Sequence, residues 1–176
     1  MDSILRLFIE EPEREFHVRE ISKILKKSPT TISKYLKNYQ SKEILKSNLK
    51  LNHFFFKANL ESKKFKQLKL SYNLKLINNS GLIEFLEDYF DYPETIILFG
   101  SFSKAENNKH SDIDLLVISS KKQEPNLKSF ENKIGHKIQL FIHSKKELNK
   151  LKEKNKELFN NWINGIVLYG FFEVFK

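Results

Sequence analysis

Residues 95–119, TIILFGSFSKAENNKHSDIDLLVIS, form the stretch that decides the fold. Two apolar runs, residues 96–99 and 115–118, predict buried strands, because short runs of large aliphatic residues are typical of strands inside a sheet. Gly100 and Ser101 directly follow the first run, and Asp112-Ile113-Asp114 leads into the second. We therefore expect two neighbouring strands with polar residues gathered at one end.

The two aspartates of this stretch are candidate metal ligands. Alternate residues of a strand point to the same face, so Asp112 and Asp114 are expected to project together while Ile113 enters the core. Neighbouring carboxylates repel each other, and neither ionises easily unless a cation lies between them. Carboxylate oxygens suit Mg²⁺ or Mn²⁺, so the pair predicts a divalent metal site.

Gly100 and Ser101 are expected where the first strand turns into a short helix. Glycine lets a phosphate approach the backbone, a helix N-terminus offers free N–H groups, and Ser101 adds a hydroxyl. A phosphate site beside a metal site is typical of phosphoryl or nucleotidyl transfer. The alternative is a polar loop whose aspartates merely cap the end of a strand.

Gly-Ser, ten intervening residues and Asp-x-Asp resemble the signature of the DNA-polymerase-β-type nucleotidyltransferases, in particular the minimal nucleotidyltransferases. The likeness covers residues 96–172. It implies that Gly100 and Ser101 bind the β- and γ-phosphates of an NTP and that Asp112 and Asp114 bind the metal. It also implies a basic residue after Gly-Ser, for which Lys104 is the nearest candidate.

The resemblance further implies a third aspartate on the next strand, and here the sequence departs from the family. The matching run, residues 137–141, carries Gln139 at that position. Glutamine offers a metal a carbonyl oxygen but no charge, and it cannot act as a base toward an attacking hydroxyl. Gln139 therefore joins Asp112 and Asp114 in the candidate catalytic set, with weakened chemistry expected. If this alignment is wrong, Glu131 is the acid that completes the site.

The excess positive charge lies in the N-terminal half of the chain. The net charge is +9; residues 1–80 contain 17 Lys and Arg against 8 Asp and Glu, whereas residues 81–176 contain 14 of each kind. This shift predicts two domains with different partners. A basic domain is typical of nucleic-acid-binding proteins, and a solvated lysine-rich surface is the alternative.

The N-terminal region predicts three helices and a β-hairpin. The expected elements are a helix over residues 3–10, a brief strand over 15–18, a helix with apolar positions Val18, Ile21, Ile24 and Leu25, a helix that starts at Ser28-Pro29, and a hairpin over 44–57. This order resembles a winged helix-turn-helix domain over residues 1–58.

The third of these helices is expected to have two faces. Its inward face is predicted to hold Ile32, Tyr35, Leu36 and Tyr39. Its outward face holds side chains of the kinds that bind base edges and phosphates, namely Thr30, Thr31, Ser33, Lys34, Lys37 and Asn38. The resemblance implies that this face lies in the major groove of duplex DNA, with Lys46 and Lys50 of the hairpin on phosphates. The alternative is that the module packs on the second domain or on a copy of itself.

The remaining elements complete a prediction of an α+β chain: a winged helix over residues 1–58, a basic connecting helix within 59–80, and a nucleotidyltransferase-like α/β domain with a small mixed sheet over 81–176. The connecting helix is alternatively a dimer seam. In the last domain we expect helices over 82–90, 127–134 and 145–160, the last with a solvated face, a strand over 137–143, and an apolar segment over 162–175 that packs on the sheet.

The function expected from these features is NTP-dependent transfer of a nucleoside monophosphate to a protein or other hydroxyl acceptor. Minimal nucleotidyltransferases that resemble this chain often work beside a partner protein in toxin–antitoxin pairs. The alternatives are a DNA-binding transcriptional regulator whose second domain is inactive and senses nucleotide, or an interaction module that docks a partner. The chain has no cysteine and no apolar run of ~18 residues, which predicts a cytoplasmic protein without a membrane span.

Overall fold

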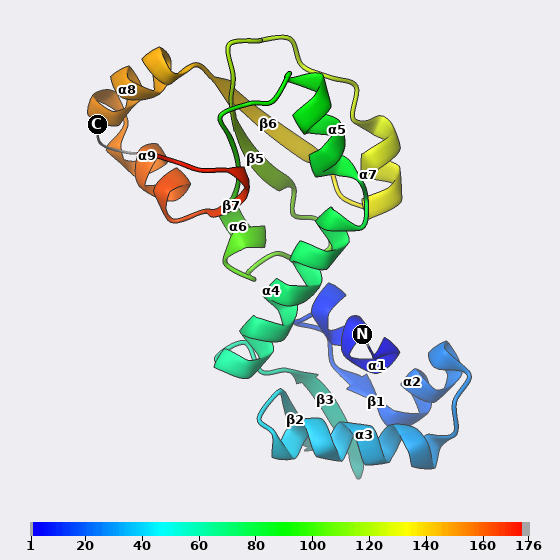
Figure 1. Ribbon diagram of the computed structural model, residues 1–176. Coiled ribbons are helices and arrows are strands. Elements are labelled where there is room, and N and C mark those ends of the chain that lie inside the picture. The colour runs from blue at the N-terminus through cyan, green and yellow to red at the C-terminus, as the bar shows by residue number, and fades with distance from the viewer. Residues whose placement is uncertain (1, 174–176) are drawn as a thin grey trace. The chain divides into compact units, whose positions relative to one another are not determined.

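The computed structural model describes residues 2–173 and divides the chain into two compact units, residues 1–72 and 73–176 (Figure 1). The boundary falls within the long helix α4 (Lys63–Asn78), which occupies the segment predicted as a connecting helix. Each unit has its own apolar core. No helix among the described residues is long and apolar enough to cross a membrane.

The N-terminal unit contains the predicted helices and hairpin in the predicted order. The elements are α1 (Ser3–Glu10), β1 (Phe16–His17), α2 (Val18–Leu25), α3 (Pro29–Ser41), β2 (Leu45–Lys50) and β3 (His53–Ala58). The strands form an antiparallel sheet in the order β1-β3-β2. The Ser28 hydroxyl accepts the Thr31 N–H at 3.2 Å, and Pro29 lies in the first turn, so α3 begins as expected.

Two apolar residues of these helices, of which Tyr35 was predicted to face inward, lie outside this core. Ile32, Leu36 and Tyr39 are buried, but Tyr35 is 43% exposed and Ile24 of α2 is 47% exposed. Only a narrow stripe of each helix packs against the core. Ile24 and Tyr35 lie at the edge of this stripe, and the residues that follow them, Leu25 and Leu36, are less exposed. The predicted inward face of α3 was therefore too wide.

A mixed sheet forms the centre of the C-terminal unit, as predicted, and it has a fourth strand that was not predicted. Its strands are β4 (Thr95–Phe99), β5 (Ile113–Ile118), β6 (Ile138–His143) and β7 (Ile166–Gly170). The spatial order is β6-β5-β4-β7; β5 and β6 are parallel, and the other two pairs are antiparallel. A parallel pair requires a crossover connection, which α7 (Lys128–Ile134) provides.

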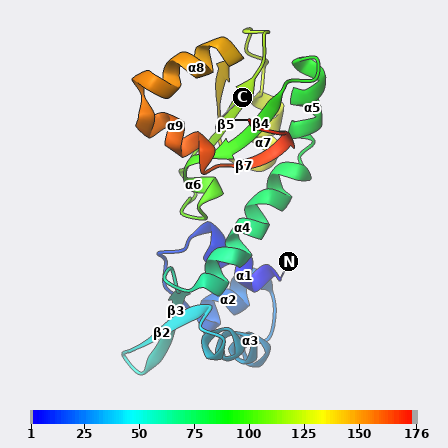
Figure 2. The same ribbon diagram turned by 60° about the vertical axis from the view of Figure 1, so that its left-hand side comes forward.

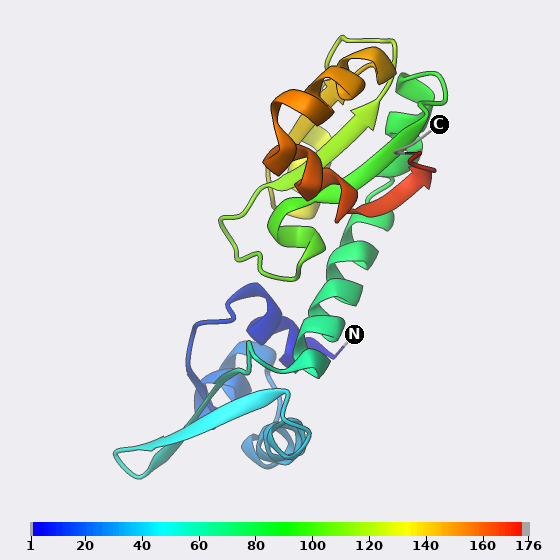
Figure 3. The ribbon, with the colours of Figure 1, turned by 90° about the vertical axis from the view of Figure 1, so that its left-hand side faces the viewer.

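Helices cover both faces of this sheet (Figures 2 and 3). On one face, Ile113, Leu115 and Val117 pack with α5 (Leu82–Tyr89), α7 and the end of α4. On the other face, Leu116 and Ile118 pack with α8 (Lys145–Lys154) and α9 (Lys156–Ile163). Alternation along the strands thus serves two separate cores.

Of the two predictions for the end of the chain, one is wrong and the other is only partly confirmed. The single solvated helix over residues 145–160 is two helices, because the backbone of Asn155 leaves the helical region and its side chain accepts the Leu158 N–H at 3.1 Å to start α9. Leu148 and Phe159 of these helices are buried against the sheet. The segment over residues 162–175 lies on the sheet only in part: Trp162, near the end of α9, is buried against the sheet, whereas residues 166–170 form β7 at its edge. Residues 174 and 175 lie outside the described residues.

Candidate nucleotide and metal site

The turn after β4 lies directly against β5. Gly100 begins the short helix α6 (Gly100–Ser103) with φ +68°, a conformation that L side chains rarely adopt. A Cβ atom at this position would overlap Oδ2 of Asp114. Glycine is therefore needed both for the turn and for the close approach of the backbone to the Asp114 carboxylate.

Asp112 and Asp114 flank the fully buried Ile113 at the start of β5. Asp112 is exposed and Asp114 is half-buried. Burial, and next the neighbouring charge of Asp112, raise the pKa of Asp114 above its ordinary value. The negative charge of Asp112 thus acts on Asp114, and a cation between two such carboxylates would relieve their repulsion.

Gln139 is the register partner of Asp114 in the parallel pair of β5 and β6. Directly paired residues on adjacent strands place their side chains on the same face, with the strands about 4.8 Å apart. The structure thus brings Gln139 beside Asp114, where the family resemblance expects a third acid. Glu131 is used elsewhere: its Oε1 accepts the Ile138 N–H at 3.0 Å, which fixes the start of β6 against α7.

The donor set at this end of the sheet fits a divalent cation. Among residues 2–173, no group of three or more His, Cys, Asp or Glu side chains is arranged to hold a metal. Mg²⁺, however, is commonly bound by one or two protein carboxylates, with water and substrate phosphates supplying the other ligands. The protein ligands of such a cation would be the carboxylates of Asp112 and Asp114 and the amide oxygen of Gln139.

Ser101 and Lys104 occupy opposite ends of α6. Ser101 is half-buried in the first turn, and its carbonyl accepts the Glu106 N–H at 2.9 Å. Lys104 is exposed at the C-terminal cap of the helix. The Ser103 hydroxyl donates to the Gly100 carbonyl at 2.9 Å, which tightens the turn between them. Ser101 thus adjoins the carboxylates through Gly100, whereas Lys104 lies on the outer part of the loop.

Two residues that the sequence analysis did not single out anchor this loop. Asn73 of α4 is fully buried, and its Nδ2 donates to the Phe102 carbonyl at 2.9 Å and to Oδ1 of Asn107 at 2.8 Å. At the other end of the loop, Nδ1 of His136 lies 2.8 Å from the Ser111 carbonyl. The only sequence signal for Asn73 is its four-residue spacing from the buried Ile77.

The candidate DNA-contacting residues lie on α3 and on the β2–β3 hairpin. On the solvent side of α3, Ser33 is half-buried and the exposed members are Thr30, Thr31, Lys34, Lys37 and Asn38. Nζ of Lys46 lies 2.6 Å from Oε2 of Glu61, and Nζ of Lys50 lies 2.5 Å from Oε2 of Glu15. Exposed pairs of this kind contribute little to stability, so a phosphate can compete for either lysine.

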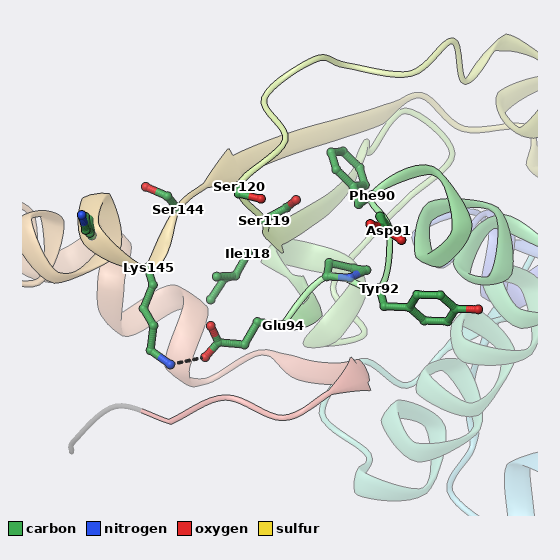
Figure 4. A pocket seen from close by; sticks show the side chains of 11 residues that line it. Phe90, Asp91, Tyr92, Glu94, Ile118, Ser119, Ser120, Ser144 and Lys145 are labelled. Carbon is green, nitrogen blue, oxygen red and sulfur yellow. Dashed lines mark hydrogen bonds and ion pairs between the residues drawn. The ribbon is translucent and has the colours of Figure 1, made fainter.

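An open pocket of about 450 Å³ lies at the opposite end of the sheet from Asp114 (Figure 4). It is bordered by the turn between α5 and β4, the end of β5 and the start of α8. An ion pair of 2.6 Å between Nζ of Lys145 and Oε1 of Glu94 crosses one side of it. The pocket contains none of the predicted site residues.

Comparison with known proteins gives one match. A protein-family model described as "Polymerase beta, Nucleotidyltransferase" matches residues 80–171. This span includes Gly100, Asp112, Asp114 and Gln139 together with all four strands of the sheet. No curated protein and no solved structure matches the chain.

Proposed function

We propose, on the premise that this chain belongs to the polymerase-β nucleotidyltransferase family, that it transfers a nucleoside monophosphate from an NTP to a hydroxyl group. The observation that carries the proposal is the contact between Gly100 and Asp114, because it joins a phosphate-binding turn to a metal-binding carboxylate. Transferases of this family typically use divalent metals, and Mg²⁺ or Mn²⁺ fits the donor set described above.

Each residue has a distinct role in the proposed reaction. The Gly100–Ser101 turn binds the β- and γ-phosphates through backbone N–H groups and the Ser101 hydroxyl, and Lys104 approaches the same phosphates from the outer loop. Asp112, Asp114 and the Gln139 amide hold the cation, which neutralises charge on the transferred phosphoryl group when it is bound. The acceptor oxygen then forms a bond to the α-phosphorus, the bond from that phosphorus to the bridging oxygen breaks, and pyrophosphate leaves.

Gln139 limits the rate of this reaction. Its amide cannot accept the proton of the acceptor hydroxyl, so that proton passes to water or to a group of the acceptor itself. Slow transfer is the expected result, and an acceptor on a partner protein that brings its own base relieves the limitation. This favours a protein hydroxyl as the acceptor.

The N-terminal unit supports a role in DNA binding. Its three helices and hairpin have the order of a winged helix-turn-helix domain, and the solvent side of α3 holds lysine, threonine and asparagine side chains. We propose that this side of α3 enters the major groove. The second candidate function, a DNA-binding regulator whose nucleotidyltransferase domain senses nucleotide without transferring it, is favoured by Gln139.

One experiment separates the two functions. The full chain is incubated with NTPs labelled at the α-phosphate and with Mg²⁺ or Mn²⁺, alone and with cell lysate, beside the Asp112→Asn/Asp114→Asn variant. Movement of label to an acceptor by the wild-type chain, but not by the variant, supports the transferase. Metal-dependent nucleotide binding without transfer supports the sensor. Equal binding by the wild type and the variant contradicts both functions.

A further inference from the structure

The tip of the β2–β3 hairpin exposes large apolar side chains. Leu49 is 61% exposed, Leu51 94% and Phe54 55%. Figures 2 and 3 show that the hairpin extends beyond the helices of its unit, so the tip is not covered by α1, α2 or α3. Exposed single leucines are common, but three large apolar residues on one tip suggest an interaction surface.

These residues continue the core-facing side of the hairpin outward. Leu49 and Phe54 are direct register partners. The pair formed by Leu45 and Ala58 lies on the same face and is buried in the core. The apolar face of the hairpin therefore extends beyond the core, and at Leu49 and Phe54 no other part of the unit covers it.

Leu51 occupies a strained position at the extreme of the tip. It and Asn52 form the two-residue connection between the strands, with φ of +47° and +59°. Such a turn favours Asn or Gly at both positions, and a γ-branched apolar residue is unfavourable there. Strain of this kind is concentrated at functional positions.

We propose that the hairpin tip is an apolar wedge that enters the minor groove of duplex DNA and inserts Leu51 between base pairs. The inference rests on the proposed DNA-binding role of the N-terminal unit. Residues 1–72 contain 16 Lys and Arg against 8 Asp and Glu, so their charge complements a polyanion. Leu49 and Phe54 then lie along the groove behind Leu51, and the inserted side chain kinks the duplex.

Charge also favours a polyanion as the occupant of the tip. Lys46, Lys50 and Lys57 lie on the opposite face of the same hairpin. A duplex places phosphates along both sides of the groove, so the same lysines become favourable.

The test uses the full chain and a duplex that contains 2-aminopurine and carries donor and acceptor dyes at its ends. Base unstacking increases the 2-aminopurine emission, and a kink increases energy transfer. The key variant is Leu51→Asn, because asparagine suits the turn and so preserves folding. The matched control is Leu60→Asn, a 42% exposed leucine outside the hairpin.

We expect the wild-type chain to unstack and kink the duplex. Leu51→Asn should lose both signals and bind about tenfold more weakly, as expected for one lost apolar contact, with an unchanged salt dependence. Leu60→Asn should behave as wild type.

Three results contradict the inference. If the wild type binds without unstacking and Leu51→Asn binds equally well, the wedge is wrong while DNA binding stands. If neither protein binds at low salt, the proposed DNA role fails and the wedge fails with it. If the chain dimerises and Leu51→Asn abolishes the dimer, the tip is an interface between copies.

Discussion

Asp114 and Gln139 lie side by side across the parallel pair of β5 and β6, on the face of the sheet that α8 and α9 cover. In the proposed site, the residues that would hold a cation beside Asp114 are the neutral Gln139 amide and the Asp112 carboxylate. This asymmetry leaves the site with less negative charge than three acids would provide, and it makes residue 139 the most informative position to change.

Gln139→Asp is expected to increase nucleotidyl transfer. The new carboxylate adds a ligand charge and a candidate base, and a positioned base contributes roughly 10²–10⁴-fold in rate. The measurement is label transfer from an α-labelled NTP with Mg²⁺ and with Mn²⁺. Gln139→Asn, which keeps an amide, is the control and should remain slow. A fast wild-type enzyme that Gln139→Asp slows would show that residue 139 does not occupy the third acidic position.

Asp114→Asn is expected to abolish the metal response without lowering stability. The pKa of Asp114 is raised in the folded state, so folding favours its protonated form. Asp114 therefore contributes most to stability at low pH, and this contribution is lost as the pH rises through the ordinary aspartate pKa and then through the raised pKa of the folded state. Asparagine does not ionise, so the variant does not lose this stability. The Tm of the variant at neutral pH should therefore equal or exceed that of the wild type. Mg²⁺ with nucleotide should raise Tm only for the wild type. A lower Tm with an unchanged ligand response would make the carboxylate structural.

Gly100→Ala is expected to impair nucleotide binding by displacing the Asp114 carboxylate. The matched control is Gly135→Ala, which has φ +83° and no atom within 4 Å of the added Cβ. Both changes should cost about 1–2 kcal/mol of folding free energy from backbone strain alone. Only Gly100→Ala should also weaken nucleotide affinity, measured by titration calorimetry. Equal affinities in the two variants would mean that the Gly100 turn does not form the phosphate site.

Asn73→Ala is expected to loosen the loop that carries Ser101. It leaves the Phe102 carbonyl and the Asn107 side chain without their Asn73 donor, at a cost of about 1–3 kcal/mol in the free energy of unfolding. Urea denaturation measures the loss, and a rise in KM for NTP larger than the fall in kcat would locate the effect in nucleotide positioning. Asn78→Ala, at the exposed end of the same helix, is the control. Parallel changes in both variants would indicate a general effect on α4.

Charge reversal at Lys34 and Lys37 is expected to weaken duplex DNA binding and to flatten its salt dependence. Each phosphate contact contributes a slope of about −0.9 in a plot of log K against log salt concentration. Fluorescence anisotropy of the full chain at several salt concentrations measures this slope. Lys150→Glu, at an exposed position of α8, should leave it unchanged. If Lys150→Glu matters as much as the two α3 changes, binding is a property of overall charge.

The sequence predicts most of the end of the sheet that holds Gly100 and Asp114, because the signals there are local. The spacing of Gly100 and Asp114 depends on only a few neighbouring residues. The same is true of the alternation that places Gln139 and Leu140 on opposite faces of the sheet. Strand alternation then fixes the register, since a shift by one residue would bury Gln139 and expose Leu140.

The features that sequence reasoning missed depend on distant partners. In the sequence, Asn73 is one of several polar residues of a basic helix. Its role depends on the loop that contains Phe102, which packs against it only in the folded protein. The end of α8 at Asn155 competes with a continuous helical pattern and is decided by how Leu148 and Phe159 pack on the sheet. Strand β7 was missed because its apolar run fits a buried edge strand and a covering segment equally well.

Trp162 gives this molecule a built-in optical probe. It is the single tryptophan of the chain, and it is fully buried between Phe99 and His143 on the same face of the sheet as Asp114. Within residues 2–173 its indole Nε1 has no hydrogen-bond partner, so its fluorescence emission maximum should lie at a shorter wavelength than that of a solvent-exposed tryptophan. Burial, followed by the charge of Lys122, lowers the pKa of His143, so protonation of that ring should quench the indole only in acid. Because Phe99 pairs with Asp114 and also contacts Trp162, nucleotide binding at the proposed site is expected to change this emission without an attached dye.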